Sequence, residues 1–423
     1  MPRSRFTLYK GRYSRLRVEE RPTGNSLNSL RSLIDQEETG DKIAMRKICV
    51  FPNDPMRAYY QKGEVKERYF NTCNFFDEVQ IISPCERDIE ENKVQIMAGD
   101  AKLKIFPIGK FHILNFFSHK NKVLKLIEEL KPDIIRAYNP LVQGYFAIYC
   151  GKKLRIPTVV SLHGNYDKDI RQLLWEDKQL KKYFKYLIYS KTTEPYVLKN
   201  ATKVICAYEF PVQYAKKYGA KDIEVIYNRV DTTRFRKTST AKPSRPTVMC
   251  VGRLIREKNQ QVLIKAVKNL DMNLLLIGDG PLYPYLTKLT KNLGVEEKVK
   301  FIKSVPNSEI HKYYSSADIF AIPIRYGGVC TPVIEAMASS LPIVVPKPRW
   351  EDSPELVGDI AIVVENTPEG FEEAFKKLMS DPKLRKELGE KGKKRALEVD
   401  GEKMEKKEVN LYKSLIEEDS KAH

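Results

Sequence analysis

The chain has 423 residues, more than one hydrophobic core usually organises, so two or three domains are expected. Hydrophobic residues make up 42 % and aromatic residues 10 %, which excludes an intrinsically disordered chain, and no apolar run approaches the ~20 residues that span a bilayer. The formal net charge of +19 is concentrated in residues 45–240, where 35 Lys and Arg oppose 22 Asp and Glu, so an anionic partner or surface is weighed against a merely solubilising charge.

Residues 1–44 are rich in arginine and then polar, and they lack the apolar core of a signal peptide. We expect this segment to be a disordered N-terminal extension, with Met45 as an alternative start of translation. The first strand follows directly, in the run RKICVFP.

Short apolar runs alternate with longer amphipathic stretches from Met45 onward, the pattern of βαβ units and a parallel sheet. The strands expected in the first half are RKICVFP, EVQIIS, KLKIFPI, PDIIRAY, IPTVVSLHG, KVICAYE and IEVIYN. Those expected in the second half are TVMCVGRL, NLLLIGDG, KVKFIKSV, DIFAIPI, PIVVP and AIVVE. Residues 236–246 interrupt the alternation with Pro and Ser and are the expected linker. The pattern predicts two doubly wound α/β domains, at 45–235 and 247–398, and a C-terminal helix at 399–423 that could cross back to the first domain.

Helical spacing of apolar residues is clear in residues 121–131, and residues 64–76 are expected to be helical as well. Residues 170–189 form a basic amphipathic pattern. One face of this helix carries Leu173, Leu180, Phe184 and Leu187, and Lys178, Lys181, Lys182 and Lys185 lie mostly on another. Such a helix can lie on anionic lipid headgroups, although packing the apolar face against the domain is the favoured interpretation.

Candidate ligand-binding residues follow strands of the second half, where ligands of open α/β sheets are bound. Arg253 and Lys258 come directly after the first of these strands and just before a helix, and two cations beside a helix N-terminus suit a diphosphate. Taken alone, they are more often solvated surface cations. The glycines of IGDGP (277–281), after the next strand, permit a tight turn and a close approach of the backbone to a ligand.

A third element, residues 323–346, opens a helix with Gly327 and Gly328 and carries Glu335 on its second or third turn. Free amides at a helix start can bind a phosphate, and a carboxylate further along can accept hydrogen bonds from ribose hydroxyls. An ordinary surface glutamate is the alternative, but apolar neighbours on both sides make it less favourable.

Over residues 45–400 the sequence resembles the retaining GT-B glycosyltransferases of family 4. The resemblance rests on several elements in family order: IYNRVDTTRF (226–235), VGRLIREKN (251–259), IGDGPLYPYL, VKFIKSVPNSEIHKYYSSADIFAIP and PELVGD (354–359). It implies a GT-B fold, in which two Rossmann-like domains face a cleft, and transfer of a sugar from a nucleotide-sugar donor to an acceptor, with retention. The donor would be a UDP- or GDP-sugar, for example, and no metal or other cofactor would be required.

The resemblance also implies roles for individual residues. Arg253 and Lys258 would hold the diphosphate of the donor, Glu335 would bind the ribose, and Gly327 and Gly328 would bring helix amides to the phosphate. In the first half, His163 in SLHGNYD would sit in the cleft against the transferring sugar, with a satisfied histidine at a strand end as the alternative. Gly63 would line the acceptor side.

The chain departs from the family pattern at the start of the second-half helix. Where the family has P-S-x-x-E-G-F-G, Gly327 replaces the first Glu and Cys330 replaces the second Gly. Lys303 and Ser304 replace a small turn near the nucleotide base. One feature points to another fold: Asp167, Lys168 and Asp169 form a DxD, a metal-binding signature that arises easily by chance in a charged chain.

The seven cysteines form no CxxC pair, and the five histidines show no metal-ligand spacing, so we expect a cytoplasmic protein without a metal site. Its partners would be a nucleotide-sugar and a glycan, lipid-linked or small-molecule acceptor, with a peripheral position on the cytoplasmic membrane face as a further hypothesis. Two alternatives stay open. One is a catalytically altered GT-B protein that binds nucleotide-sugars or, less favourably, nucleic acid, and the other is a nucleotide-sugar epimerase or phosphorylase.

Overall fold

The computed structural model describes residues 45–110, 116–235, 244–326, 329–349 and 360–422. They fall within one compact unit, Met45–His423. The expected extension 1–44, most of the expected linker 236–246, Gly327 and Gly328, and the PELVGD motif lie outside the described residues.

The first half forms a seven-stranded sheet in which every neighbouring pair is parallel, in the order β3-β2-β1-β4-β5-β6-β7. Its strands are β1 (Lys47–Phe51), β2 (Glu78–Ser83), β3 (Lys102–Pro107), β4 (Ile134–Ala137), β5 (Thr158–Leu162), β6 (Lys203–Cys206) and β7 (Ile223–Val225). The central strands are buried on both faces, which explains why they read as continuous apolar runs.

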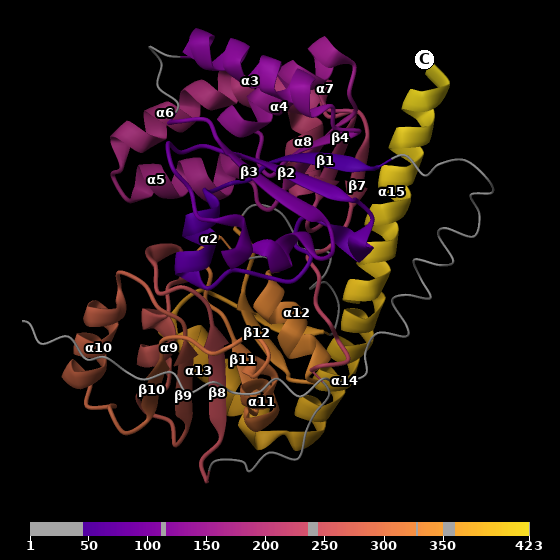
Figure 1. Ribbon diagram of the computed structural model, residues 1–423. Coiled ribbons are helices and arrows are strands. Elements are labelled where there is room, and N and C mark those ends of the chain that lie inside the picture. Colours follow the sequence, from indigo (N-terminus) through magenta and orange to yellow (C-terminus); the bar gives the residue numbers. More distant parts are fainter. Residues whose placement is uncertain (1–44, 111–115, 236–243, 327–328, 350–359, 423) are drawn as a thin grey trace, which may run out of the picture. The chain divides into compact units, whose positions relative to one another are not determined.

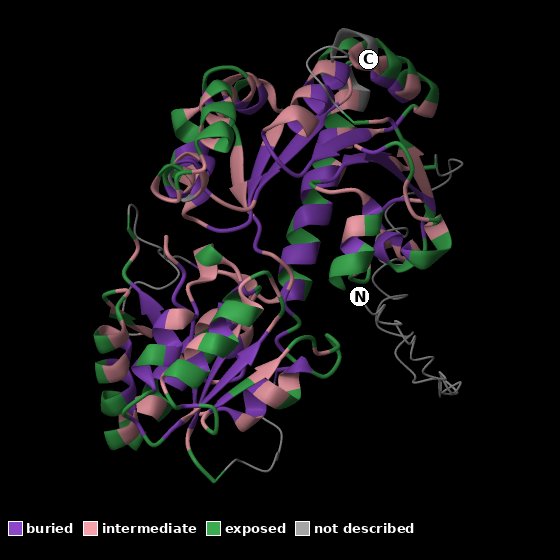
Figure 2. Ribbon diagram, turned by 90° about the vertical axis from the view of Figure 1, so that its left-hand side faces the viewer, coloured by how far each residue is buried: buried purple, intermediate pink, exposed green. Residues whose placement is uncertain are grey.

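The second half repeats this arrangement with a six-stranded parallel sheet in the order β10-β9-β8-β11-β12-β13. Its strands are β8 (Thr247–Val251), β9 (Asn273–Ile277), β10 (Val299–Ile302), β11 (Ile319–Ala321), β12 (Ile343–Pro346) and β13 (Ala361–Val364). Every strand of both sheets lies within a run that the sequence pattern predicts. The prediction of two Rossmann-like doubly wound domains is confirmed, and buried strands form the centre of each (Figure 2).

Helices cover the sheets on both faces (Figure 1). Those of the first domain are α2 (Met56–Lys62), α3 (Phe116–Leu130), α4 (Val142–Leu154), α5 (Leu173–Glu176), α6 (Leu180–Lys191), α7 (Thr193–Asn200) and α8 (Pro211–Lys217). Those that follow are α9 (Gln261–Ala266), α10 (Tyr283–Asn292), α11 (Ile310–Ser316), α12 (Thr331–Ala338), α13 (Pro368–Ser380), α14 (Pro382–Glu398) and α15 (Gly401–Ala422). Of the helices in the described ranges, none combines the length and apolarity needed to cross a bilayer.

Two helix predictions were wrong. Residues 64–76 contain only a short 3-10 turn, because α2 ends at Gly63 and the side chain of Asn71 instead bonds the backbone oxygens of Phe76 and Ala98, at 3.0 and 2.9 Å. Residues 170–189 are not one helix, because Lys178 adopts a left-handed conformation with φ 55° and separates α5 from α6.

The long C-terminal helix α15 packs against the first domain (Figure 1). The ring of Tyr412 lies 6.3 Å from that of Phe75 and 5.2 Å from that of Phe76. Glu408, one turn earlier, pairs with Arg136 of β4, and both side chains are buried. The helix therefore ties the end of the chain to the sheet of the first domain.

Candidate active site

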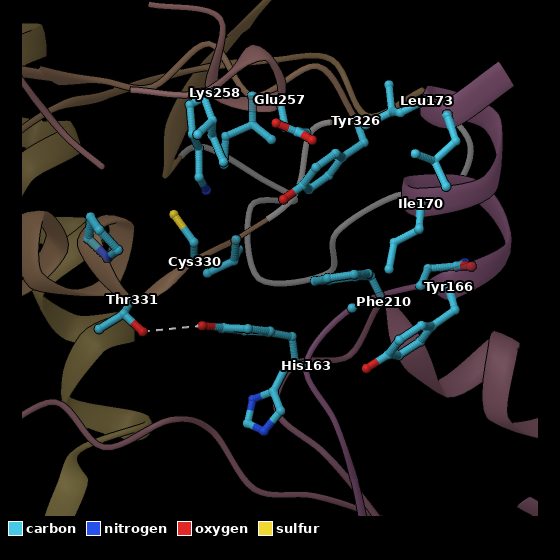
Figure 3. Close-up of a pocket in the computed structure, with 18 of the residues that line it drawn as sticks. His163, Tyr166, Ile170, Leu173, Phe210, Glu257, Lys258, Tyr326, Cys330 and Thr331 are labelled. Atoms are coloured by element: carbon cyan, nitrogen blue, oxygen red, sulfur yellow. Dashed lines mark hydrogen bonds between the residues drawn. The ribbon is translucent and has the colours of Figure 1, made fainter. Parts of the chain in front are cut away.

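A cavity of about 530 Å³ lies between the two sheets, where loops follow the strands (Figure 3). Residues after β5 and on α5 line it from the first domain, and residues after β8, after β11 and at the start of α12 line it from the second. The side chains that project into it include His163, Tyr166, Phe210, Glu257, Lys258, Tyr326, Cys330 and Thr331. Its size is typical of a pocket that encloses a small-molecule ligand.

Lys258 is the cation that the second domain contributes to this cavity (Figure 3). It ends a 3-10 turn, Arg256–Lys258, and the chain then turns through Asn259, whose φ of 53° is left-handed. The side chain of Gln260 fixes the loop by donating a 2.9 Å hydrogen bond to the backbone oxygen of Arg253. Arg253 itself is exposed and is absent from the lining of the cavity, so the structure separates the two cations that the sequence paired.

Helix α12 directs its N-terminus at the same cavity, with Cys330, Thr331 and Pro332 in the lining. Its N-cap residue Cys330 makes no side-chain capping bond. Pro332 has no N–H and the N–H of Val333 donates to the backbone oxygen of Cys330 at 2.9 Å, so Thr331 is the residue of the first turn whose amide can serve an anion. Gly327 and Gly328, to which the sequence assigns this role, lie just before it and outside the described residues.

Glu335 lies on the second turn of α12, partly buried and outside the lining of the cavity. Its carboxylate accepts a 2.7 Å hydrogen bond from the buried phenol of Tyr314. Burial raises the pKa of Glu335 above its ordinary value, although Tyr314, Lys66 and Arg234 act to lower it. The carboxylate is thus oriented by one partner and retains acceptor capacity for a ligand.

His163, in the loop after β5, faces the cavity from the first domain (Figure 3). Its ring stacks on that of Tyr138, with centroids 5.8 Å apart and planes 4° from parallel, and its buried Nε2 has no hydrogen-bond partner among the described residues. Burial lowers the pKa of His163 to about 4, and the charges of Arg136 and Lys66 act in the same direction. The imidazole is therefore neutral near pH 7, with one nitrogen available to a ligand.

The lowered pKa predicts how stability depends on pH. Below pH 6.5 the unfolded chain protonates this histidine and the folded protein does not until about pH 4, so the free energy of unfolding should fall as the pH is lowered through that window. Carboxylates titrate there too, so the measurement is the difference between wild type and His163→Gln in urea unfolding at pH 7 and pH 4.5. We expect the variant to lose less stability, by up to about 3 kcal/mol. Equal losses in the two proteins would contradict the lowered pKa.

A tyrosine that the sequence analysis did not single out connects the two domains at this site. Asn228 donates a 2.9 Å hydrogen bond to the hydroxyl of Tyr208, which lies 3.4 Å from the hydroxyl of Thr331 on α12. Asn228 belongs to the motif at 226–235, but Tyr208 follows β6, and only its place after a strand could have indicated it.

A cluster of charges also joins the domains beside the cavity. Arg325, after β11, donates hydrogen bonds of 2.9 Å to both Asp177 and Glu176, just beyond α5 and at its end, and Arg349 bonds the two oxygens of Glu176 at 2.9 and 3.1 Å. Arg256 lies 3.4 Å from Asp177. The sequence gives no sign that these residues, which lie from 79 to 173 positions apart, would meet.

A smaller cavity of about 160 Å³ adjoins the main one, with His163, Asn228 and Thr331 in both linings. Three cations line it: Arg136 and Arg229 pair with Glu408 and Glu405 of α15, and Lys66 makes no ion pair with a described carboxylate. Gly63 caps α2 in a left-handed conformation and is not in the lining of either cavity. Lys66 and Tyr69, further along this loop, do line the smaller cavity.

The glycines after β9 allow the loop after β9 to pack closely against the loop after β8. Gly278 has a φ of +146°, and a Cβ added there would lie 2.1 Å from the backbone oxygen of Gly252, after β8. Gly278→Ala should therefore displace the loop that carries Lys258 and lower the free energy of unfolding by about 3 kcal/mol. Gly63→Ala is the matched control, because its φ is also positive but no atom lies within 4 Å of an added Cβ, and it should cost only about 1 kcal/mol. Equal melting temperatures for the two variants would contradict this account.

Of the DxD residues, only Asp167 has a described side chain, and its carboxylate is already paired with cations. Asp167 pairs with Arg171 at 2.7 Å and with Lys217, and the side chains of Lys168 and Asp169 lie outside the described residues. The described side chains include no group of three or more His, Cys, Asp or Glu that could hold a metal ion.

Solved structures share this fold. The Anabaena protein HepE in complex with UDP superposes with a TM-score of 0.66 at 15 % identity, and the match covers 88 % of this chain and 100 % of that chain. Two parallel α/β domains with a cavity between them define a GT-B protein.

Sequence comparison identifies the family. Residues 77–234 match the sequence model described as Glycosyltransferase Family 4, and residues 231–395 match that of the Glycosyl transferases group 1. The chain belongs to the group 1 glycosyltransferases with the GT-B fold.

Two relatives show what such proteins act on. A GDP-mannose-dependent alpha-(1-6)-phosphatidylinositol monomannoside mannosyltransferase of Mycolicibacterium smegmatis is 29 % identical over 209 residues, which cover 44 % of this chain and 55 % of the relative. An N-acetylgalactosamine-N,N'-diacetylbacillosaminyl-diphospho-undecaprenol 4-alpha-N-acetylgalactosaminyltransferase of Campylobacter jejuni is 30 % identical over 188 residues, which cover 43 % of this chain and 50 % of the relative. The chain thus spans about half the length of each of these two relatives.

Proposed function

We propose that this protein transfers a sugar from a nucleotide-sugar donor, such as a UDP- or GDP-sugar, to a lipid-linked acceptor, with retention of configuration at the anomeric carbon. One arrangement carries the proposal: Lys258 and the start of α12 face His163 of the other domain across the same cavity (Figure 3). A lysine and a helix N-terminus stabilise the negative charge that develops on a departing diphosphate, so the transfer would need neither a metal ion nor another cofactor.

The donor would lie on the side of the second domain. Its diphosphate would meet Lys258 and the amides near Gly327, Gly328 and Cys330, and Arg253 on the same loop is the second cation that the family pattern assigns to it. Glu335 would accept hydrogen bonds from the ribose hydroxyls. His163, neutral near pH 7 and with a free Nε2, would contact the transferring sugar.

The acceptor would enter from the first domain, in the loop region that includes Gly63. The smaller cavity supports an acceptor that carries a phosphate, because Lys66, Arg136 and Arg229 line it beside one carboxylate, that of Glu408, and Lys66 makes no ion pair with a described carboxylate. Both relatives described above act on sugars attached to a phosphate-bearing lipid, as their names state. The excess of basic residues over 45–240 favours the same class of acceptor.

The test is turnover with purified protein. UDP-, GDP- and ADP-sugars are each incubated with phosphatidylinositol or with a polyprenyl phosphate, and released nucleotide is measured by chromatography. We expect release with one donor class only in the presence of an acceptor, and a product whose anomeric configuration, measured by NMR, equals that of the donor sugar. Release without an acceptor, or conversion of the donor into another nucleotide-sugar, would contradict the proposal.

Glu335→Ala separates ribose recognition from diphosphate recognition. If Glu335 binds the ribose, the variant should bind nucleoside diphosphate about 10-fold or more weakly, since a lost hydrogen bond to a charged group costs about 1.5–3 kcal/mol, and should bind inorganic diphosphate as wild type does. Isothermal titration with both ligands makes the comparison. A parallel loss for the two ligands would assign Glu335 a purely structural role through its bond to Tyr314.

A further inference from the structure

The helix α6 exposes the apolar side chains that its amphipathic pattern was expected to bury. Leu180, Phe184 and Ile188 are 47 %, 54 % and 61 % exposed, and Trp175 of the neighbouring α5 is 56 % exposed. The first three recur at every fourth position and so form one stripe along the helix. The expectation that Leu180 and Phe184 pack inward is therefore wrong.

The opposite side of α6 explains why the helix is nevertheless fixed. Tyr186 packs against the core of the first domain, Ser190 is buried, and Tyr183 lies 5.1 Å from the ring of Trp175. The helix thus has one face against its own domain and a second apolar face directed outward. We define the docking face as Trp175, Leu180, Phe184 and Ile188.

The part of the docking face on α6 is bordered by charge of one sign, whereas the acidic residues beside Trp175, Glu176 and Asp177, are paired with arginines. Helix α6 contains four lysines and no acidic residue, and Lys178 precedes it. None of Lys181, Lys182 and Lys185 makes an ion pair with a described carboxylate, and all three are exposed. An apolar stripe bordered by lysines is the pattern of a helix that lies in the interface of an anionic bilayer.

We propose that the docking face binds the surface of an anionic membrane. Two other occupants are disfavoured by charge. A second copy of the chain on a twofold axis would bring the same lysines against one another. Residues 1–44 contain 9 Lys and Arg against 6 Asp and Glu, so this segment has a net positive charge and does not complement the lysines beside the docking face.

The position of the face connects it to the main cavity. On α5, Leu173 and Leu174 line that cavity while Trp175 points to solvent, so one short helix contributes to both. Helices α5 and α6 lie on the side of the first domain away from α15 (Figure 1). A protein bound to a bilayer through this face would hold its main cavity close to the lipid surface, because the cavity-lining Leu174 directly precedes Trp175 of the docking face. A lipid-linked acceptor is presented at that surface.

The binding test uses the full chain and no donor or acceptor sugar. Vesicles of phosphatidylcholine alone, or with phosphatidylglycerol added, are sedimented with the protein at low and at high salt. We expect partition to the anionic vesicles that salt weakens. Phe184→Ser with Ile188→Ser should lower the partition coefficient at least about 10-fold, and Lys181→Gln with Lys185→Gln about 25-fold, since each lysine near an anionic surface contributes about fivefold.

Matched variants on exposed helices elsewhere control for general effects. Leu397→Ser on α14 removes an apolar side chain that is 47 % exposed, and Lys288→Gln with Lys291→Gln on α10 removes two exposed charges. Both controls should partition as wild type does. A wild-type protein that stays in the supernatant with anionic vesicles, or controls that lose as much as the docking-face variants, would overturn the proposal.

Two further measurements decide between occupants. With Trp350 replaced by Phe, Trp175 is the only tryptophan, and its fluorescence should be quenched by acrylamide in solution and shift to the blue on anionic vesicles. If Trp175 is shielded from acrylamide without vesicles, another segment of the chain covers the docking face. If the protein is a dimer that Phe184→Ser dissociates, the docking face binds a second copy. Either result would overturn the proposal. The inference rests on the proposed function only in assuming a lipid-linked acceptor. A protein that binds nucleotide but not anionic vesicles would defeat the inference alone. A protein that binds anionic vesicles but no nucleotide would defeat the proposed function alone.

Discussion

Lys258→Ala should abolish the stabilisation that a nucleoside diphosphate gives to this protein. Lys258 projects into the main cavity and is held by a loop that Gln260 and Asn259 fix, so its charge is pre-positioned for a diphosphate. Removing one partner of a desolvated charge pair costs about 2–5 kcal/mol of binding free energy, and a loss of about 3 kcal/mol raises Kd about 100-fold. At 100 times the wild-type Kd, ligand stabilisation would then fall from about 2.7 to about 0.4 kcal/mol.

Thermal unfolding with and without UDP and GDP gives the measurement, and two variants give the control. Lys265→Ala removes an exposed lysine of the same segment, on α9, and should keep the full shift. Lys258→Arg keeps the charge but not the shape of the ammonium group, so it should retain part of the shift. A full shift in Lys258→Ala would remove Lys258 from the donor site.

Glu408→Ala should destabilise the fold by about 3–5 kcal/mol, because it strands Arg136 as a buried, uncompensated charge. The pair is enclosed: Tyr412 donates a 2.8 Å hydrogen bond to Glu408, and the guanidinium lies 4.6 Å from the ring of Tyr138. Burial alone would raise the pKa of Glu408, but Arg136 lowers it below the ordinary value, so the pair's stabilisation is present near neutral pH and lost as the pH falls.

Urea unfolding at pH 7 measures the effect of Glu408→Ala against two controls. Glu402→Ala, on the same helix, breaks an exposed pair with Lys406 and should cost at most about 0.5 kcal/mol. Replacing both members, with Arg136→Met and Glu408→Leu, should recover much of the loss because no charge is left unpaired. If Glu408→Ala proves as mild as Glu402→Ala, α15 is not anchored through this pair.

The strands were predictable because strands that are buried on both faces appear in the sequence as short apolar runs. The end of each apolar run also locates the loop that follows the strand. That is how Lys258 was found, as a cation in the loop after β8, whereas His163, after β5, was assigned through the family resemblance. Local backbone chemistry was harder to predict. The pattern at 64–76 suits a helix, but Asn71 satisfies backbone groups there in another way, and Arg68, Cys73 and Asn74 adopt positive φ.

The amphipathic pattern at 170–189 marks a second limit. Periodicity shows that a helix has an apolar face but does not say what that face meets. Leu180 and Phe184 fit a buried face as well as an exposed one, and only the packing of Tyr186 and Ser190 shows which side of α6 the domain uses.

The sequence by itself determined two doubly wound domains, the family and the segments that carry Lys258, His163 and Glu335, because these depend on residues close together in the chain. Only the tertiary structure decided which side chains share a cavity. It places Lys258 in the lining of the main cavity and Arg253 outside it, and it places Lys66 rather than Gly63 in the lining of the smaller cavity. It also joins Arg325 to Asp177 and Arg136 to Glu408. Such contacts depend on how separate sheets and loops pack, and no periodicity along the chain encodes the distance between residues that lie hundreds of positions apart.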